Sequence, residues 1–363
     1  NSPHNIVSVL SEQTALITFT TGSSGVPKGV DRTHRFLAAQ HYALNQFVPY
    51  LENDVDMPTF PVFALNNIAS GVSTVIPAVD LSSFQTSDSE ILIQQIINWK
   101  VTCATFSPAI FNRLSQYCIE NSKKLPKLRR IITGGAPISR DDLSRFESIA
   151  NRAENIVLYG STEVEPIAYI TAKEWLSKAE DDNNGVNVGR IAKDLKYCFI
   201  KINKEPVAIS NQHDWERLNV KDNELGELLV AGEHVSDRYF DNPQAWQTTN
   251  IRDTDGTIWH RTGDLGKVDK AGYLWIVGRV HNAILRNGEY LYTVPVEIIL
   301  KKLPFVTQAA YLGLPDQEFG ERAVAVVVAR EEKDQEIRDH LHRYNIPVDD
   351  VVFIEKIPMD PRH

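Results

Sequence analysis

Residues 101–118, VTCATFSPAIFNRLSQYC, take the chain from a strand into a helix. Val101–Phe106 is an apolar, partly β-branched run, which is typical of a buried strand. Ser107 offers an N-cap side chain, and Pro108 suits the first helical position. The apolar residues that follow fall on one side of a helix: Ile110, Phe111, Leu114 and Cys118. This stretch predicts one strand–helix unit of an α/β fold.

The same alternation extends to both sides of that unit. Before it lie a β-branched run, Val72–Ile76, and a predicted helix, Ser87–Lys100, which Ser87 and Glu90 would open as a capping box. After it, a strand, a helix and a strand are predicted at Arg130–Thr133, Ser139–Ala150 and Asn155–Tyr159. Such alternation implies a parallel sheet with right-handed crossovers and a ligand site at the C-terminal ends of its strands.

The pattern changes from about Glu224. Three short strands are predicted at Glu227–Ala231, Thr257–His260 and Tyr273–Val277, and turn pairs separate the last two, which favours antiparallel pairing. After Gly278-Arg279 comes a small α+β unit. Its expected helices are Val294–Leu303 and Glu331–Tyr344, and its expected strands are Ala309–Leu314, Arg322–Ala329 and Val351–Ile354. We therefore expect an α/β part at 1–223, an antiparallel β subdomain at 224–279 and a small mobile C-terminal lid at 280–363.

Composition excludes some classes of protein. The chain has 363 residues, of which 42 % are hydrophobic and 23 % charged, as in ordinary globular proteins of two or more domains. A formal charge of −9 argues against a nucleic-acid partner, and no apolar run approaches a membrane span. The three cysteines, Cys103, Cys118 and Cys198, form no CxxC pair, so we expect reduced thiols and a cytoplasmic location. The oligomeric state stays open.

A glycine- and hydroxyl-rich segment, TTGSSGVPKG at 20–29, directly follows the apolar run Ala15–Thr20. Glycines let the backbone turn its N–H groups inward, hydroxyls add donors, and Lys28 adds a mobile cation, which together suit phosphate oxygens. A plain turn would have a similar composition. The candidate residues for phosphate binding are Thr20, Thr21, Gly22, Ser23, Ser24, Gly25 and Lys28.

Three further motifs follow predicted strands. In YGSTE, at 159–163, Tyr159 can stack on a base, Thr162 can donate to a phosphate and Glu163 can hold Mg²⁺. The small residues Gly134, Gly135, Ala136 and Pro137 would let a flat ring lie on bare backbone. In RTGD, at 261–264, we expect a turn whose Asp264 accepts ribose hydroxyls, with Arg279 reaching the same sugar. Taken alone, each motif could also be an ordinary turn.

In their order along the chain, these motifs resemble the adenylate-forming superfamily of acyl-CoA synthetases, luciferases and peptide-synthetase adenylation domains. The resemblance covers nearly the whole chain and implies ATP-dependent adenylation of a carboxylic acid. It places ATP phosphates on the loop Thr20–Lys28, adenine between Tyr159 and Gly135–Pro137, Mg²⁺ on Glu163 and the ribose on Asp264 and Arg279. Lys28, Thr162 and Glu163 would carry the catalytic charge neutralisation. The implied cofactors are ATP and Mg²⁺, with coenzyme A as an alternative acceptor substrate.

A closer likeness is to the β-lactone synthetases of bacterial olefin biosynthesis, in Phe60–Leu65, Tyr159–Pro166, Leu291–Glu297 and Met359–His363. Those enzymes adenylate a long-chain β-hydroxy acid, whose hydroxyl then displaces AMP. Ala64 stands where most relatives have His, and would widen the acyl pocket unless it is ordinary drift in a core strand. By family analogy the pocket is lined by Phe63, Asn66, Asn67, Gly71, Ser107 and Gly134. An acyl-CoA ligase and a catalytically silent nucleotide-binding module remain as alternatives.

The chain also departs from the superfamily pattern. His281 occupies the hinge position that is usually Asp or Lys, and the catalytic lysine is expected just beyond His363. Because an N-terminal piece is also expected, we interpret the chain as part of a longer protein. His34, His41, His213, His260 and His340 show no metal-ligand spacing, so we expect solvent or local hydrogen bonds around them. We expect Trp99, Trp175, Trp246 and Trp275 to pack rather than to contact ligands.

Overall fold

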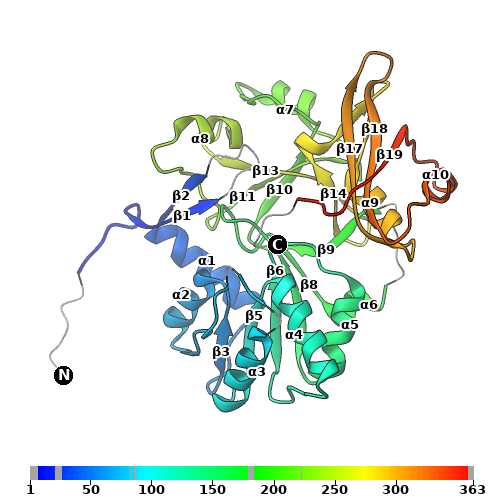
Figure 1. Ribbon diagram of the computed structural model, residues 1–363. Helices are drawn as coiled ribbons and strands as arrows, with labels where there is room; N and C mark the ends of the chain where they lie inside the picture. The colour runs from blue at the N-terminus through cyan, green and yellow to red at the C-terminus, as the bar shows by residue number, and fades with distance from the viewer. Residues whose placement is uncertain are drawn as a thin grey trace.

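A computed structural model describes residues 7–20, 27–81, 83–85, 87–178, 184–221 and 223–358. Within these ranges one long mixed sheet has the strand order β10-β11-β13-β14-β9-β8-β7-β6-β5-β3-β4 (Figure 1). Its parallel part contains β3 (Val55–Pro58), β4 (Ser73–Thr74), β5 (Cys103–Phe106), β6 (Arg130–Gly134) and β7 (Glu154–Tyr159). This arrangement confirms the predicted α/β class and its parallel sheet.

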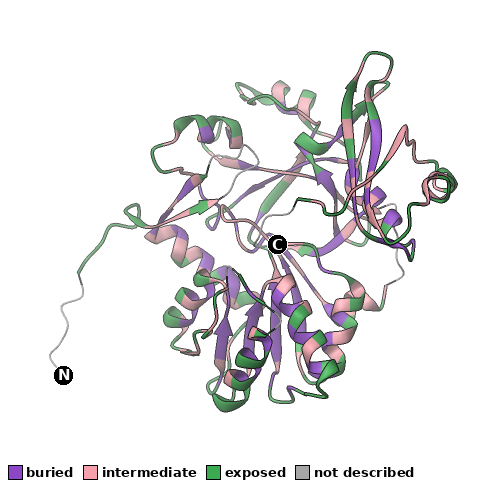
Figure 2. Cartoon of the chain, in the orientation of Figure 1, coloured by how far each residue is buried: buried purple, intermediate pink, exposed green. Residues whose placement is uncertain are grey.

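The helices of the parallel part pack on the sheet, and α4 (Pro108–Glu120) does so through its predicted face. They are α2 (Pro61–Ser70), α3 (Asp88–Asn98), α4 (Pro108–Glu120), α5 (Arg140–Ile149) and α6 (Ala172–Leu176). In α4 the Ser107 hydroxyl accepts from the Ile110 N–H, and the four expected apolar residues are buried in one core cluster. Figure 2 shows these strands as buried, with exposed outer faces on the helices. Trp99 does not fit the packing expectation, because it is 64 % exposed.

The predicted capping box at the start of α3 is wrong. Ser87 already has helical backbone angles (φ −61°, ψ −29°) and makes no side-chain cap, so its hydroxyl does not fold back onto the first turn. Instead the Asp88 carboxylate accepts from the Gln85 N–H at 2.6 Å. A capping box does form at α5, between Ser139 and Asp142.

Beyond β7 the sheet becomes antiparallel. The further strands are β8 (Ala168–Thr171), β9 (Val186–Ile191), β10 (Lys196–Ile200), β11 (Gly226–Ala231), β12 (Asn250–Arg252), β13 (Ile258–Val268) and β14 (Leu274–Arg279). Two short helices, α7 (Gln212–Leu218) and α8 (Pro243–Thr249), lie between them. Because β9 and β10 precede Glu224 and pair with later strands, the sheet continues across residue 223. The division into three domains stays a prediction.

A separate two-stranded hairpin precedes the main sheet. Its strands are β1 (Thr14–Thr20) and β2 (Lys28–Thr33), and Thr20 is paired with Lys28. Helix α1 (His34–Phe47) follows, capped by the Thr33 side chain. The hairpin therefore places the two described ends of the phosphate-loop motif side by side.

The C-terminal unit has its own core and agrees closely with its predicted elements. It contains η2 (Val280–Asn282), β15 (Ile284–Arg286), β16 (Glu289–Leu291), α9 (Thr293–Lys301), β17 (Val306–Asp316), β18 (Gly320–Ala329), α10 (Asp334–Arg343) and β19 (Asp350–Phe353). Strands β17, β18 and β19 form a separate sheet beside the large one (Figure 1). No helix in the described ranges has both the length and the apolarity needed to cross a bilayer.

Candidate functional site

Three of the predicted nucleotide-binding residues meet around one carboxylate. Tyr159, at the end of β7, donates its hydroxyl to Asp264 Oδ2 at 2.6 Å. Arg279, at the end of β14, donates from Nε to Asp264 Oδ1 at 2.9 Å. Burial, followed by the Asp264 charge, raises the pKa of Tyr159 well above its usual value, so its hydroxyl stays protonated. Strands from the parallel and antiparallel parts thus converge on Asp264.

The RTGD motif does not form the expected turn, because it lies inside the long strand β13. Residues 262–264 bulge out opposite Leu228 alone, and Gly263 takes a left-handed conformation with φ +72°. Because of this bulge, the Arg261 and Asp264 side chains of the motif have different surroundings. Asp264 faces Tyr159 and Arg279, whereas Arg261 is buried and donates from Nη2 to Glu227 at 2.6 Å.

Glu163 lies beside this cluster and has a defined hydrogen-bond partner. Tyr239 donates its hydroxyl to Glu163 Oε1 at 3.0 Å, and the Ser236 N–H donates to the Glu163 carbonyl at 2.7 Å. Burial raises the pKa of the Glu163 carboxyl, but His260 and the hydrogen bonds outweigh burial and leave the pKa lowered. Glu163 is therefore ionised at neutral pH, as a cation ligand must be.

The charges of Glu163 and of Lys28, in the phosphate-loop motif, both act on His260. It is 3 % exposed on β13, and its Nδ1 lies 3.4 Å from Asn250 Oδ1, in line with the expected local hydrogen bonding. Burial lowers its pKa, the Glu163 and Asp264 charges oppose that effect, and the Lys28 charge adds to it. Lys28 is thus close enough to His260 to act on it electrostatically. Thr20 faces Lys28 across the hairpin, whereas Thr21, Gly22, Ser23, Ser24 and Gly25 lie outside the described residues.

Two polar side chains hold the backbone of residues 160–165, which include Gly160 and Thr162. Arg32, which is 2 % exposed, donates from Nη2 to the Thr162 carbonyl at 2.6 Å. Gln40 donates to the Glu165 carbonyl at 3.3 Å. Sequence reasoning missed both residues, together with Tyr239. No motif marks them, because their roles depend on contacts between distant segments.

The GGAP motif needs its first glycine for steric reasons. A Cβ on Gly134 would lie 2.2 Å from the carbonyl oxygen of Leu158 on the neighbouring strand. Gly135 has φ +82°, and a Cβ added there would lie 3.8 Å from the ring of Phe60, the N-cap residue of α2. Ala136 and Pro137 follow directly. Gly134 and Gly135 thus lie beside the end of β7, since β6 and β7 are neighbours, and their role toward a flat ring stays a prediction.

The predicted acyl-pocket residues are spread over three places. Phe63, Asn66 and Asn67 are buried on α2, Gly71 ends that helix, Ser107 caps α4 and Gly134 ends β6. Asn67 is already engaged, because it donates to Asp56 at 2.7 Å and accepts from the Tyr50 hydroxyl at 2.6 Å. Ala64 is half-buried on helix α2 and not on the expected core strand. The lining role of these residues stays a prediction.

A metal ion has few protein ligands available here. The described residues contain no group of three or more His, Cys, Asp or Glu side chains that could hold a metal. A single ionised carboxylate suits Mg²⁺, which usually keeps waters and binds one or two carboxylates plus substrate phosphates. Glu163 fits this kind of site.

Two family models match this chain, one over its larger N-terminal part and one near its C-terminal end. The model of the AMP-binding enzyme family matches residues 2–240, and that of the AMP-binding enzyme C-terminal domain matches residues 295–362.

Curated relatives include an olefin β-lactone synthetase of Stenotrophomonas maltophilia, which is 33 % identical over 84 % of this chain and 55 % of the relative. A second one, from Xanthomonas campestris, is 32 % identical over 84 % of this chain and 54 % of the relative, so the chain spans about half the length of these two proteins. A long-chain-fatty-acid–CoA ligase of Mycobacterium tuberculosis is 28 % identical over 95 % of this chain and 64 % of the ligase.

Among solved structures, the o-succinylbenzoate coenzyme A synthetase of Bacillus subtilis, in complex with ATP and magnesium ion, superposes with a TM-score of 0.76. The two sequences are 21 % identical, and the superposition covers 97 % of this chain and 68 % of the synthetase. An amide bond synthetase of Marinactinospora thermotolerans has a TM-score of 0.75 at 22 % identity, covering 95 % of this chain and 66 % of that one. These likenesses show the fold.

Proposed function

The chain belongs to the AMP-binding enzyme family, and from this premise we propose that its protein transfers AMP from ATP to a carboxylic acid. A carboxylate oxygen attacks the α-phosphorus, the bond to the bridging oxygen breaks, and pyrophosphate leaves. The observation that carries the proposal is the cluster of Tyr159, Asp264 and Arg279 beside the ionised Glu163.

Each residue of the cluster has a role that its chemistry allows. Asp264 accepts hydrogen bonds from the ribose hydroxyls, with Arg279 fixing the carboxylate. Tyr159 and Gly135–Pro137 flank the adenine. Lys28, Thr162 and the loop Thr20–Gly25 neutralise and orient the phosphates, which is the main contribution a protein makes to transfer at phosphorus. Mg²⁺ held by Glu163 would supply further positive charge to the phosphate oxygens.

For the second step we propose closure by the substrate's own β-hydroxyl. The hydroxyl oxygen attacks the acyl carbon, AMP leaves with the bridging oxygen, and the hydroxyl proton is released, which gives a β-lactone. The similarity to the two olefin β-lactone synthetases supports this step and a long-chain acid as substrate. Transfer to coenzyme A is the second candidate, supported by the similarity to a fatty-acid–CoA ligase. The free thiols Cys103, Cys118 and Cys198 fit a cytoplasmic protein.

Two matched long-chain acids separate these reactions. The complete gene product is given ATP and Mg²⁺ with an acid that carries a β-hydroxyl or with the same acid lacking it, and pyrophosphate release is followed. Sustained turnover with the hydroxy acid alone, giving a product lighter by one water, is the result we expect. Turnover that requires coenzyme A and ignores the hydroxyl would replace lactone closure by thioester formation. No release with any acid would favour a silent nucleotide-binding module.

A further inference from the structure

The hydroxyl of Tyr239 lies against the carboxylate that the proposed function assigns to Mg²⁺. It donates to Glu163 Oε1 at 3.0 Å, and Thr249 Oγ1 lies 3.2 Å from the same hydroxyl oxygen. A tyrosine hydroxyl can donate this hydrogen bond and at the same time accept one from Thr249. One carboxylate oxygen is therefore held by a defined donor, and a carboxylate has further lone pairs with which it can bind a cation.

The backbone around Tyr239 is paired with strand β2, which begins at Lys28. The Phe240 N–H donates to the Gly29 carbonyl at 2.7 Å, and the Asp31 N–H donates to the Arg238 carbonyl at 3.2 Å. Val30 and Tyr239 form an isolated antiparallel bridge between these two bonds. The segment that holds Glu163 is thus in fixed register with the strand that carries Lys28.

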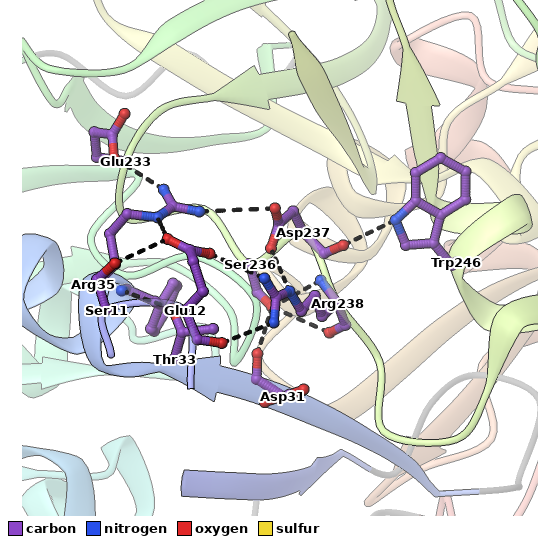
Figure 3. A network of polar contacts seen from close by, with 11 residues as sticks. Ser11, Glu12, Asp31, Thr33, Arg35, Glu233, Ser236, Asp237, Arg238 and Trp246 are labelled. Atoms are coloured by element: carbon purple, nitrogen blue, oxygen red, sulfur yellow. Dashed lines mark hydrogen bonds and ion pairs between the residues drawn. The ribbon is translucent and has the colours of Figure 1, made fainter. Parts of the chain in front are cut away.

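A polar network keeps the same segment in place (Figure 3). Glu12 accepts from Arg35 at 2.7 Å and from Arg238 at 2.9 Å, so it joins the start of α1 to the segment before Tyr239. Arg35 also donates to Glu233 at 2.9 Å. The indole N–H of Trp246 donates to the Asp237 carbonyl at 2.8 Å. Each exposed ion pair is weak alone, but together they restrict residues 233–238 from several directions.

We propose that Tyr239 is a positioning residue for Glu163, and that it sets the carboxylate in the orientation in which it receives Mg²⁺ beside the nucleotide phosphates. This inference rests on the proposed function. Its physical basis is that a ligating carboxylate is oriented by the donors that bind its other lone pairs. Because residues 238–240 pair with β2, the Glu163 carboxylate and Lys28 are both positioned by the same hydrogen-bonded pair of segments.

The test is Tyr239→Phe, which removes the hydroxyl and keeps the ring. Binding of ATP to the complete gene product is measured by calorimetry at a series of Mg²⁺ concentrations and without the metal. We expect the Mg²⁺ concentration that half-maximally strengthens ATP binding to rise by about 10- to 100-fold. Binding without metal should be unchanged, because the inference gives Tyr239 no contact with the nucleotide.

Tyr273→Phe is the matched control. The Tyr273 hydroxyl also donates to a glutamate, Glu174 Oε1, but neither residue belongs to the candidate site. Its Mg²⁺ dependence should equal that of the wild type. Glu163→Gln provides the second comparison, since Tyr239→Phe should have no further effect once the carboxylate is gone.

The outcomes separate this inference from the function on which it rests. If the wild type binds ATP in a Mg²⁺-dependent way and Tyr239→Phe shows the same dependence, the positioning role is wrong and the proposed function stands. An effect of Tyr239→Phe that persists undiminished in the Glu163→Gln background would likewise overturn it. If the wild type itself shows no Mg²⁺-dependent ATP binding, the proposed function fails.

Discussion

At the scale of single residues, the candidate site contains residues that the sequence motifs predicted and others that no motif marks. Tyr159, Asp264 and Arg279 were recognisable from their motifs, and the structure brings them into contact. Tyr239 and Arg32 were not recognisable, because nothing local distinguishes them from other tyrosines and arginines. Their positions follow from pairing between segments more than a hundred residues apart. Residues that stand in a sequence motif are therefore easier to predict here than residues whose contacts join distant segments.

Asp264→Asn tests the ribose assignment. The amide accepts at one oxygen only and turns an NH₂ group toward donors, so it loses acceptor capacity for sugar hydroxyls. We expect ATP affinity to fall by about 10- to 100-fold, which corresponds to about 1.5–3 kcal/mol for hydrogen bonds to a charged group. Calorimetry with ATP and with 2′,3′-dideoxy-ATP checks the cause. The wild type should prefer ATP, and the variant should bind both alike; an undiminished preference for ATP in the variant would refute the assignment.

Arg261→Met tests the structural role that the β13 bulge gives to Arg261. The Arg261 and Glu227 side chains are 7 % and 2 % exposed, so the variant leaves a buried carboxylate without its cation. We expect the free energy of unfolding to fall by about 3–5 kcal/mol in denaturant titrations. The double variant Arg261→Met with Glu227→Met should recover much of this loss. If Arg261→Met instead weakened ATP binding at unchanged stability, Arg261 would belong to the site.

At the scale of elements, the sequence predicted those strands and helices whose ends and faces depend on neighbouring residues. The strand and helix at Cys103–Phe106 and Pro108–Glu120 follow from an apolar run, a capping serine and an N1 proline. The RTGD motif was misplaced because its bulge exists only through pairing of β13 with β11. The capping box at Ser87 failed for a similar reason, since a suitable pair of side chains does not fix the backbone angles at the cap.

Gly134→Ala tests whether close packing of β6 and β7 shapes the adenine side of the site. The added Cβ would meet the Leu158 carbonyl at 2.2 Å, so the end of β6 must shift. We expect a loss of about 1–3 kcal/mol in the free energy of unfolding, as for other overpacked positions, together with weaker ATP binding. Gly288→Ala is the control for nucleotide affinity only: nothing lies within 4 Å of an added Cβ, and the stability that this variant loses comes from backbone strain at φ +79°. Unchanged nucleotide affinity in Gly134→Ala would contradict the close approach.

At the scale of the whole molecule, different residues gather at the two edges of the large sheet at which its parallel strands end and begin. The candidate site gathers where β6 and β7 end, as expected for an α/β sheet. At the opposite edge, Asp54 accepts from Arg129 and from the Thr102 hydroxyl before β3 and β5 begin. The alternation of strands and helices predicted a site at the first of these edges. The second could not be predicted, because single acidic and basic residues carry no signal of which partner they will meet.

Asp54→Asn tests the contacts at this opposite edge through the pH dependence of stability. Burial raises the pKa of the Asp54 carboxyl, but the hydrogen bonds from Arg129, the Leu51 N–H and Thr102 outweigh burial, so the folded-state pKa lies below the ordinary 3.8. The stabilisation is therefore complete well above the ordinary pKa of 3.8 and is lost as the pH falls from there toward the lower folded-state pKa. We expect the variant to be less stable than the wild type by about 1.5–3 kcal/mol at pH 7, with a smaller difference near pH 3. A difference independent of pH would contradict the ion pair.

The central claim is that a carboxylate attacks the α-phosphorus of ATP, and oxygen labelling tests it most directly. The complete gene product is incubated with ATP, Mg²⁺ and a β-hydroxy acid whose carboxylate contains ¹⁸O, and the nucleotide product is weighed by mass spectrometry. Adenylation predicts AMP that carries one ¹⁸O atom, since the attacking oxygen leaves with AMP. Glu163→Gln should form little of it. Formation of ADP, or of AMP without the label, would contradict the account.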